Sequence, residues 1–189
     1  MTAPLPTSTA EGTRLAPFGL TPDGVCDDLP QRMAQWAHGA ALIEDLTPQE
    51  ATTLGALMPK VRAPGGQTLI KEGEVGDWML LLLSGTVDVC KADGAGAPSR
   101  LAVIAQGAAV GEMSMLDGSP RYATCTAIDD VEAGVLTRAT ITRLIREHPA
   151  IGAKLLVKLT QILAQRLRNT SNQVVKLVQQ QAKLAKNEK

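Results

Sequence analysis

The sequence predicts an α+β, mainly β fold, a small sandwich or jelly roll with helices at both ends. Residues 61–136 are short β-rich runs separated by glycine pairs and Asp-Gly turns, a spacing typical of sandwich strands. Helical hydrophobic patterns lie on both sides of this region. The chain has 189 residues, and 44% are hydrophobic, which is enough for one core of this size.

The first 60 residues predict a tail followed by two helices. Residues 1–28 are rich in Pro, Thr, Gly and Ala without periodicity, so we expect a disordered tail. Residues 29–60 are assigned to N-terminal helices. The first helix places side chains at three- and four-residue steps, at Met33, Trp36, Ala40 and Ile43. In the second, Thr47 can cap, Pro48 fits the first position, and Glu50 completes a capping box.

Residues 61–137 are assigned to the β domain. The run TVDVCK alternates, so Val87 and Val89 are expected on one face. Residues 93–99, DGAGAPS, are typical of an exposed hairpin loop, and residues 124–137 supply the last strands. The three cysteines lack metal or redox spacing, and we expect small hydrophobic side chains in a reducing compartment.

Residues 138–189 are predicted to be helical, with a short helix first and a long one opened by Pro149. The long helix carries a heptad seam at Leu163, Leu167, Thr170, Val174, Leu177, Gln181 and Leu184. The same helix of a second copy is the favoured partner, which gives a homodimer, and packing back on its own domain is the alternative. The polar seam residues Thr170 and Gln181 weaken such an interface but can set its register.

Charge and composition limit the possible functions. The formal net charge is zero, but residues 1–137 carry a balance of −9 and residues 138–189 one of +9. The basic part is either a solvated helix face or attractive to phosphate, nucleic acid or an acidic partner. Aromatic residues make up 2%, too few for stacking on single-stranded nucleic acid. The only histidines, His38 and His148, fall on predicted helices, so we expect no metal site and no enzyme.

No apolar run is as long as a membrane span, and no signal-peptide pattern is present, so a cytoplasmic protein is expected.

The stretch GEMSMLDGSPRYATCTA, Gly111 to Ala127, holds the candidate site. A glycine-led turn before a short helix exposes backbone N–H groups that favour an anion. Arg121 supplies a planar fork for phosphate oxygens. Glu112 would repel phosphate, so it implies a neighbouring donor such as a ribose hydroxyl. A simple salt bridge between Glu112 and Arg121 is the alternative.

This stretch resembles the phosphate-binding cassette of the cyclic nucleotide-binding domain family. The matching positions are Gly111, Glu112, Ser114, Leu116, Pro120, Arg121, Ala123 and Thr124. The glycine-punctuated run with Gly73, Gly76 and Gly85 is also similar, and the resemblance covers about residues 40–172. It implies an eight-stranded jelly-roll β-barrel or sandwich with a long C-terminal dimerisation helix.

The resemblance also implies residue roles. Glu112 would accept from the ribose 2′-hydroxyl, Arg121 would pair with the cyclic phosphate, and the base would lie on apolar strand residues. Residues 164–174 resemble the dimer helix of the bacterial catabolite activator family, where a Thr-Ser pair meets the adenine from both subunits. The implied ligand-binding residues are Val89, Leu101, Val110, Gly111, Glu112, Met113, Ser114, Arg121, Tyr122, Ala123, Thr170 and Ser171.

Two departures from the family pattern matter. Tyr122 stands where a small residue is usual, so its ring would narrow the pocket, stack on the base or bend to solvent. The activator family has a helix-turn-helix domain after the dimer helix, whereas this sequence ends at Lys189, about twenty residues beyond Thr170. We therefore expect a stand-alone sensor of cyclic AMP without cofactor, with an effector protein as partner and no specific DNA binding. Cyclic GMP, cyclic di-GMP or a ligand-free scaffold are the alternatives.

Overall fold

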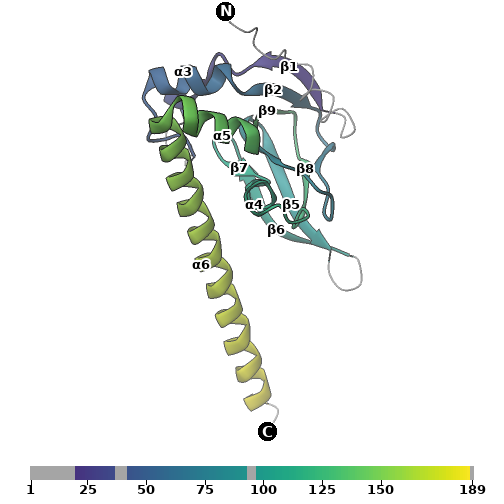
Figure 1. The fold of residues 1–189 in the computed structure, drawn as a ribbon. Helices are drawn as coiled ribbons and strands as arrows, with labels where there is room; N and C mark the ends of the chain where they lie inside the picture. The colour runs from purple at the N-terminus through teal and green to yellow at the C-terminus, as the bar shows by residue number, and fades with distance from the viewer. Residues whose placement is uncertain (1–19, 37–41, 93–96, 188–189) are drawn as a thin grey trace, which may run out of the picture.

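Two antiparallel β-sheets face each other, with helices at one end and a long helix running away from them (Figure 1). The computed structural model describes residues 20–36, 42–92 and 97–187. One sheet has the order β1-β2-β9-β4-β7 and the other β3-β8-β5-β6. The strands are β1 (Thr21–Val25), β2 (Pro59–Ala63), β3 (Thr68–Ile70), β4 (Trp78–Ser84), β5 (Thr86–Ala92), β6 (Pro98–Ala105), β7 (Ala109–Val110), β8 (Thr124–Ala127) and β9 (Val131–Thr137). The helices are α2 (Leu29–Gln35), α3 (Pro48–Ala56), α4 (Glu112–Asp117), α5 (Arg138–Glu147) and α6 (Pro149–Asn187).

The jelly-roll class is confirmed, but the described residues form nine strands rather than eight. The additional strand, β1, lies in residues 1–28, for which the sequence predicts a disordered tail. It pairs antiparallel with β2 at the edge of the five-stranded sheet. Pro22 and Gly24 hide its signal in the sequence, and an edge strand tolerates both because only one side is paired. Residues 1–19 lie outside the described part.

The N-terminal helices match the sequence pattern in part. Helix α2 ends at Gln35, the predicted position Ala40 lies outside the described residues, and Ile43 lies fully buried in a turn. Helix α3 begins with the predicted capping box. The Glu50 N–H donates to Thr47 Oγ1 at 3.2 Å, and the Thr47 N–H donates to Glu50 Oε2 at 2.7 Å.

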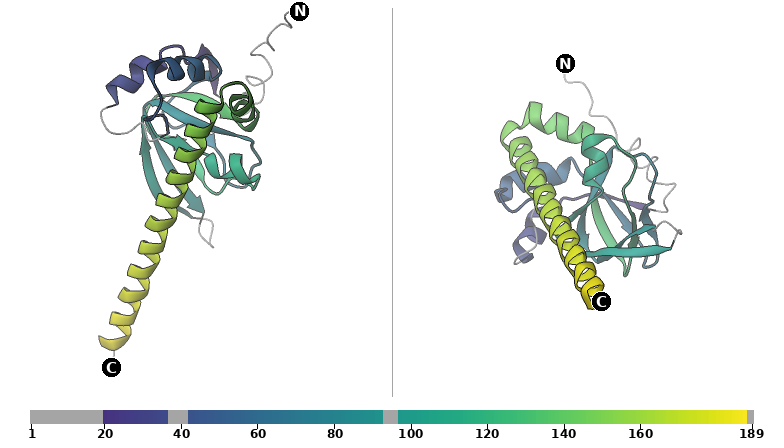
Figure 2. Two further views of the ribbon diagram at one scale, coloured as in Figure 1. Left: turned by 60° about the vertical axis from the view of Figure 1, so that its left-hand side comes forward. Right: turned by 90° about the horizontal axis from the view of Figure 1, so that it is seen from below.

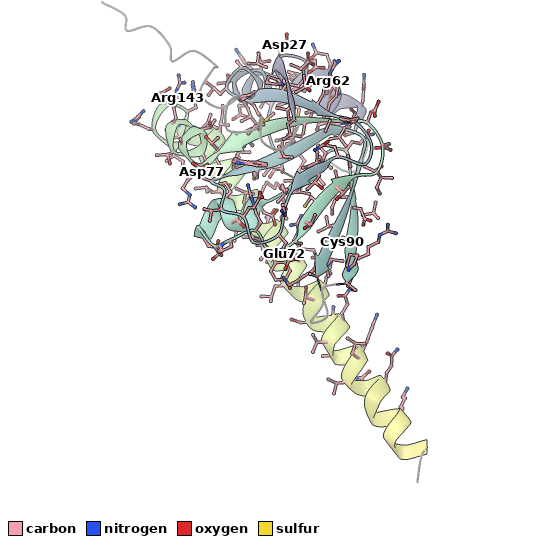
Figure 3. The ribbon with its side chains drawn as sticks, turned by 90° about the vertical axis from the view of Figure 1, so that its right-hand side faces the viewer. Asp27, Arg62, Glu72, Asp77, Cys90 and Arg143 are labelled. Atoms are coloured by element: carbon pink, nitrogen blue, oxygen red, sulfur yellow. The ribbon has the colours of Figure 1, made fainter. Side chains whose placement is uncertain are left out.

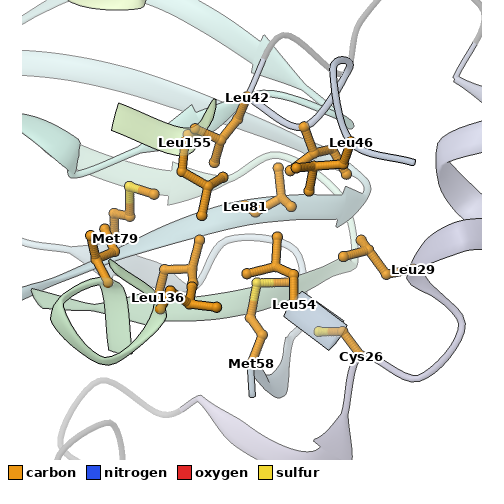
Figure 4. Close-up of a cluster of buried hydrophobic side chains, with 14 of the residues drawn as sticks. Cys26, Leu29, Leu42, Leu46, Leu54, Met58, Met79, Leu81, Leu136 and Leu155 are labelled. Carbon is orange, nitrogen blue, oxygen red and sulfur yellow. The ribbon is translucent and has the colours of Figure 1, made fainter. Parts of the chain in front are cut away.

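Strand β4 explains why the run WMLLLL is continuously apolar. Met79, Leu81 and Leu83 face the helices, in a cluster with α3, α5 and the start of α6 (Figure 4). Trp78, Leu80 and Leu82 face the opposite sheet. Because both faces of β4 are covered, the period-two alternation of a half-exposed strand is absent. Each such side chain contributes about 1.5–3 kcal/mol by leaving water.

Helix α6 has two parts with different surroundings. Near its start it packs on the body through Ile151, Leu155 and Leu159. From Leu167 to Gln180 every side chain is exposed, and the helix projects beyond the sheets (Figure 2). This part of the predicted seam therefore does not pack back on its own domain. No helix in the described ranges is long and apolar enough to cross a membrane.

Candidate functional site

The candidate site is built on the turn between β7 and α4. Gly111 caps α4 with a φ of 82°, in the left-handed region that glycine adopts without strain. The six-residue helix ends at Gly118, whose φ is also positive at 77°. The chain then returns through Arg121 into β8. This short loop places Glu112 and Arg121 close to the same glycine.

Glu112 is fully buried, and its two oxygens differ. Oε1 forms an ion pair with the Arg166 guanidinium from α6, 54 residues further on. The Arg166 Nη2 also donates to the Ala109 carbonyl at 2.9 Å. Oε2 has no hydrogen-bond partner among the described residues. A buried carboxylate oxygen without a donor is costly, so this atom is suited to accept from a ligand hydroxyl.

Arg121 is also buried, with 4% of its surface exposed, but it does not pair with Glu112. Its Nη1 donates to the Gly111 carbonyl and its Nη2 to the Trp78 carbonyl, each at 2.7 Å. Burial lowers the pKa of the guanidinium, against the opposing effect of nearby groups such as Asp77. An arginine nevertheless stays charged in proteins, so the site keeps a permanent cation. The salt-bridge alternative from the sequence is thus not what the structure contains.

Further contacts hold the cassette in shape. The Ser114 hydroxyl donates to the Pro120 carbonyl at 3.2 Å, which closes the loop on itself. Arg138 of α5 donates from Nε to the Met115 carbonyl at 2.7 Å, at the end of α4. Ser114 and Ala123 are buried, whereas Met113 is 41% exposed. Helices α5 and α6 therefore each place an arginine against α4.

The residues assigned to the base lie on neighbouring strands. Val89 of β5 pairs with Ala102 of β6, and the register shift beyond it leaves Leu101 as an extra residue. Leu101 is 47% exposed and Val89 is half-buried. Val110 is buried in β7, opposite Leu80, and supports the turn rather than offering a free surface.

The Tyr122 ring lies beside the Lys91 ammonium group. Its side chain is 54% exposed, and the Lys91 Nζ lies 4.3 Å from the ring centroid. Lys91 also donates to the Tyr122 carbonyl at 2.9 Å and to Glu72 Oε1 at 2.7 Å. Figure 3 shows Glu72 at the end of the roll where Cys90 also lies. Of the three orientations that the sequence allows for Tyr122, the structure shows a ring largely open to solvent with Lys91 beside it.

Two residues near the site were missed by sequence reasoning. Trp78 lies against the Arg121 guanidinium, 4.4 Å from ring centroid to Cζ. The charge pattern of the sequence places Arg166 only within the basic C-terminal part. Its position one helical turn before Thr170 was the available signal, since residues four apart share a helix face. Thr170 and Ser171 are themselves exposed on α6.

The described residues contain no group of three His, Cys, Asp or Glu side chains that could hold a metal ion.

This arrangement is that of a β-roll domain with a candidate small-molecule site on a glycine-led turn. The sequence model of the cyclic nucleotide-binding domain matches residues 60–148. A crystal structure of a cyclic nucleotide-binding domain from Methylobacillus flagellatus has a TM-score of 0.75 and 30% identity, covering 85% of this chain and 90% of that one. The chain belongs to the cyclic nucleotide-binding domain family, and the domain that defines this family is a regulatory sensor.

Two longer proteins are also similar. The CRP-like cAMP-activated global transcriptional regulator of Mycobacterium tuberculosis is 30% identical over 139 residues, which cover 74% of this chain and 60% of the regulator. The Thermus thermophilus catabolite activator protein has a TM-score of 0.66 and 29% identity, with 72% of this chain and 62% of that chain covered. The chain thus spans about three fifths of the length of these relatives.

Proposed function

We propose that this chain is a cyclic nucleotide sensor, that cyclic AMP is its ligand, and that it acts through a partner protein rather than by catalysis. The observation that carries the proposal is the fully buried Glu112, whose Oε2 lacks a donor and whose segment also brings in a buried Arg121. Cyclic AMP is favoured because the regulator from M. tuberculosis is named as cAMP-activated.

In this proposal each part of the ligand has its own contact. The ribose 2′-hydroxyl donates to Glu112 Oε2, and the cyclic phosphate accepts from Arg121. Backbone N–H groups near Ser114 and Ala123 add donors to the phosphate. The base lies on the apolar surface around Val89 and Leu101, with Val110, Gly111, Met113 and Tyr122 around the cassette.

The adenine edge is assigned to α6. Thr170 and Ser171 lie one turn beyond Arg166, and their exposure leaves them available to a ligand and to a second copy. We propose that two α6 helices pair along the exposed seam, so that each pocket is completed by both subunits.

The ion pair between Arg166 of α6 and Glu112 offers a route from the ligand site to the partner protein. Because the hydroxyl has its own oxygen on Glu112, Arg166 keeps its place on Oε1 when the ligand arrives. Ligand and docked α6 then stabilise each other through one carboxylate, which is the differential contact that ligand control requires. The free part of α6 presents this state to the partner protein.

Calorimetric titration with cyclic AMP, cyclic GMP and cyclic di-GMP tests the proposal. We expect micromolar or tighter binding of cyclic AMP, with Arg121→Ala losing on the order of 2–5 kcal/mol, as for one side of a buried charge pair. Arg143→Ala, at a partly exposed residue of α5 that pairs with Glu147, is the matched control and should bind normally. Tight binding of another nucleotide would name a different signal, and binding of none would leave a scaffold domain.

A fourth ligand measures the contribution of Glu112 to binding separately. The 2′-deoxy analogue of cyclic AMP should bind the wild-type protein more weakly than cyclic AMP by about 1.5–3 kcal/mol, the value of a charge-assisted hydrogen bond. Glu112→Ala should bind both ligands equally. A persistent difference in that variant would place the ribose elsewhere.

A further inference from the structure

The Arg121 guanidinium lies in a slot whose walls come from distant parts of the chain. The Trp78 ring lies 4.4 Å from its Cζ, and the Trp78 carbonyl accepts from Nη2 at 2.7 Å. On another side is Gly76, where an added Cβ would lie only 2.5 Å from Nη2 and 3.0 Å from Cζ. At Gly111 an added Cβ would lie 2.8 Å from Nη1. The slot therefore has room for the guanidinium because two of its walls carry no side chain.

The slot fixes the position of the Arg121 guanidinium and leaves some of its N–H groups without a carbonyl partner. An arginine has five N–H groups, and the two carbonyls of Gly111 and Trp78 take one from each Nη. The remaining donors can meet a bidentate anion such as a phosphate. Trp78 is 7% exposed and packed between the sheets, so its ring cannot easily turn away. The arginine is thus oriented before any ligand arrives, which reduces the ordering cost of binding.

We infer that Trp78 and Gly76 are positioning residues for the phosphate, acting through Arg121 and not by touching the ligand. Trp78 attracts the cation to its face, an interaction that grows stronger where water is excluded. Gly76 keeps the space in which the guanidinium lies flat. The inference rests on the proposed function, because it assigns these two residues to the same cyclic nucleotide site.

Gly76→Ala tests the slot without altering Trp78. Gly76 is not among the glycines of positive φ, so alanine adopts its backbone without strain. The new Cβ meets the tip of a flexible side chain, so we expect an intact fold with a displaced guanidinium. The affinity for cyclic AMP should fall about tenfold to thirtyfold. Val75→Ala, at an 81% exposed neighbour, should bind as wild type does. Unchanged affinity in a folded Gly76→Ala variant would overturn the inference.

Substitutions of Trp78 separate orientation from packing. Trp78→Phe keeps an aromatic face and should retain most of the affinity, whereas Trp78→Leu should lose about as much as Gly76→Ala. In an Arg121→Ala background Trp78→Leu should cost no further affinity, because its effect passes through the arginine. An equal loss in both backgrounds would make Trp78 merely structural.

Fluorescence gives a readout that needs no change at Trp78. The chain has two tryptophans, so Trp36→Phe leaves Trp78 as the only one. In that background, Arg121→Leu should change the emission without ligand, and cyclic AMP should change it when Arg121 is present. Unchanged emission in both tests would overturn the inference. If the wild-type protein binds no nucleotide, the proposed function fails, and the Arg121→Leu emission alone decides whether Trp78 holds the arginine.

Discussion

At the scale of single residues, the site keeps two opposite charges buried without pairing them to each other. Arg121 contacts two carbonyls and an aromatic face, and Glu112 pairs through Oε1 with an arginine from α6. If the two paired directly, a ligand would have to break a buried ion pair to use either one. With these separate partners, Glu112 Oε2 has no hydrogen-bond partner among the described residues, and the two carbonyls use only two of the five N–H groups of Arg121.

Sequence reasoning found Glu112 and Arg121 but not their partners. Both site residues lie within one short segment, where offsets alone place them on the same loop. Arg166 and Trp78 are 54 and 43 residues from the groups they contact. Such contacts depend on how the helices and sheets pack, and no local pattern encodes them.

Two buried cysteines predict a loss of stability at high pH. Burial raises the pKa of the Cys26 and Cys125 thiols from 9.0 to about 12. Between these values the unfolded chain releases a proton that the folded protein keeps. The free energy of unfolding should therefore fall above pH 9, by up to about 1.4 kcal/mol per pH unit for each thiol.

Denaturant unfolding of wild type and of the Cys26→Ala, Cys125→Ala double variant at pH 7 to 10.5 measures this. Below pH 9 the two should have parallel profiles, and above it the variant should decline less steeply. Equal slopes above pH 9 would show that these thiols do not carry the effect.

At the scale of elements, those features that depend on residues close together in the sequence could be predicted, and those that depend on distant contacts could not. The capping box of α3 uses residues three apart, so Thr47 and Glu50 could be recognised directly. Strand β1 contains Pro22 and Gly24 and forms a strand only because β2 offers a free edge. Helix α2 ends at Gln35, and Ile43, which fits the helical spacing, reaches the core from a turn instead.

Gly55 in α3 should reverse the usual effect of alanine in a helix. Alanine normally stabilises a helix interior by about 1 kcal/mol over glycine. Here an added Cβ would lie 2.1 Å from the Cys26 carbonyl oxygen, because the backbone before α2 lies against α3. We expect Gly55→Ala to destabilise the protein by about 1–3 kcal/mol, as for overpacking. Thermal unfolding of the Gly55→Ala variant, compared with that of Thr52→Ala at an exposed position of the same helix, measures this change in stability. A stabilised Gly55→Ala variant would refute the close contact.

Arg166 predicts how α6 responds to ligand. With cyclic AMP bound, hydrogen exchange of α6 amides around residues 159–170 should slow, because ligand and docked helix share Glu112. In Arg166→Ala this slowing should disappear, whereas Arg168→Ala, two residues on and exposed, should keep it. Equal protection in all three proteins would uncouple α6 from the pocket.

At the scale of the whole molecule, ion pairs within the chain neutralise part of the uneven charge between its acidic and basic parts. Lys158 of α6 pairs with Glu44 and Asp45, and Lys154 pairs with Glu50. The basic C-terminal part is thus bound to the acidic N-terminal part by ion pairs. These pairs engage two lysines, Lys154 and Lys158, that would otherwise be available to nucleic acid. This favours the reading of α6 as a docked helix over that of a nucleic-acid surface.

The exposed seam predicts an association that a single charge should break. Leu167, Val174 and Leu177 are 68%, 53% and 59% exposed on the free part of α6. We expect a dimer in sedimentation experiments at micromolar concentration, and a monomer after Leu177→Glu, because a carboxylate in the seam stays unpaired. Gln179→Glu, off the seam, should stay dimeric. A monomeric wild type would instead assign this face to another protein.

The position of α6 has a mechanical consequence. Its start is held by the ion pairs of Lys154 and Lys158, Arg166 pairs with Glu112, and the side chains from Leu167 to Gln180 are exposed. From Leu167 to Asn187, at 1.5 Å per residue, the helix is about 30 Å long, so a tilt of roughly 10° would move its end by about 5 Å. A small rotation of the held part of α6 would therefore displace the far end of the helix by about the height of one helical turn.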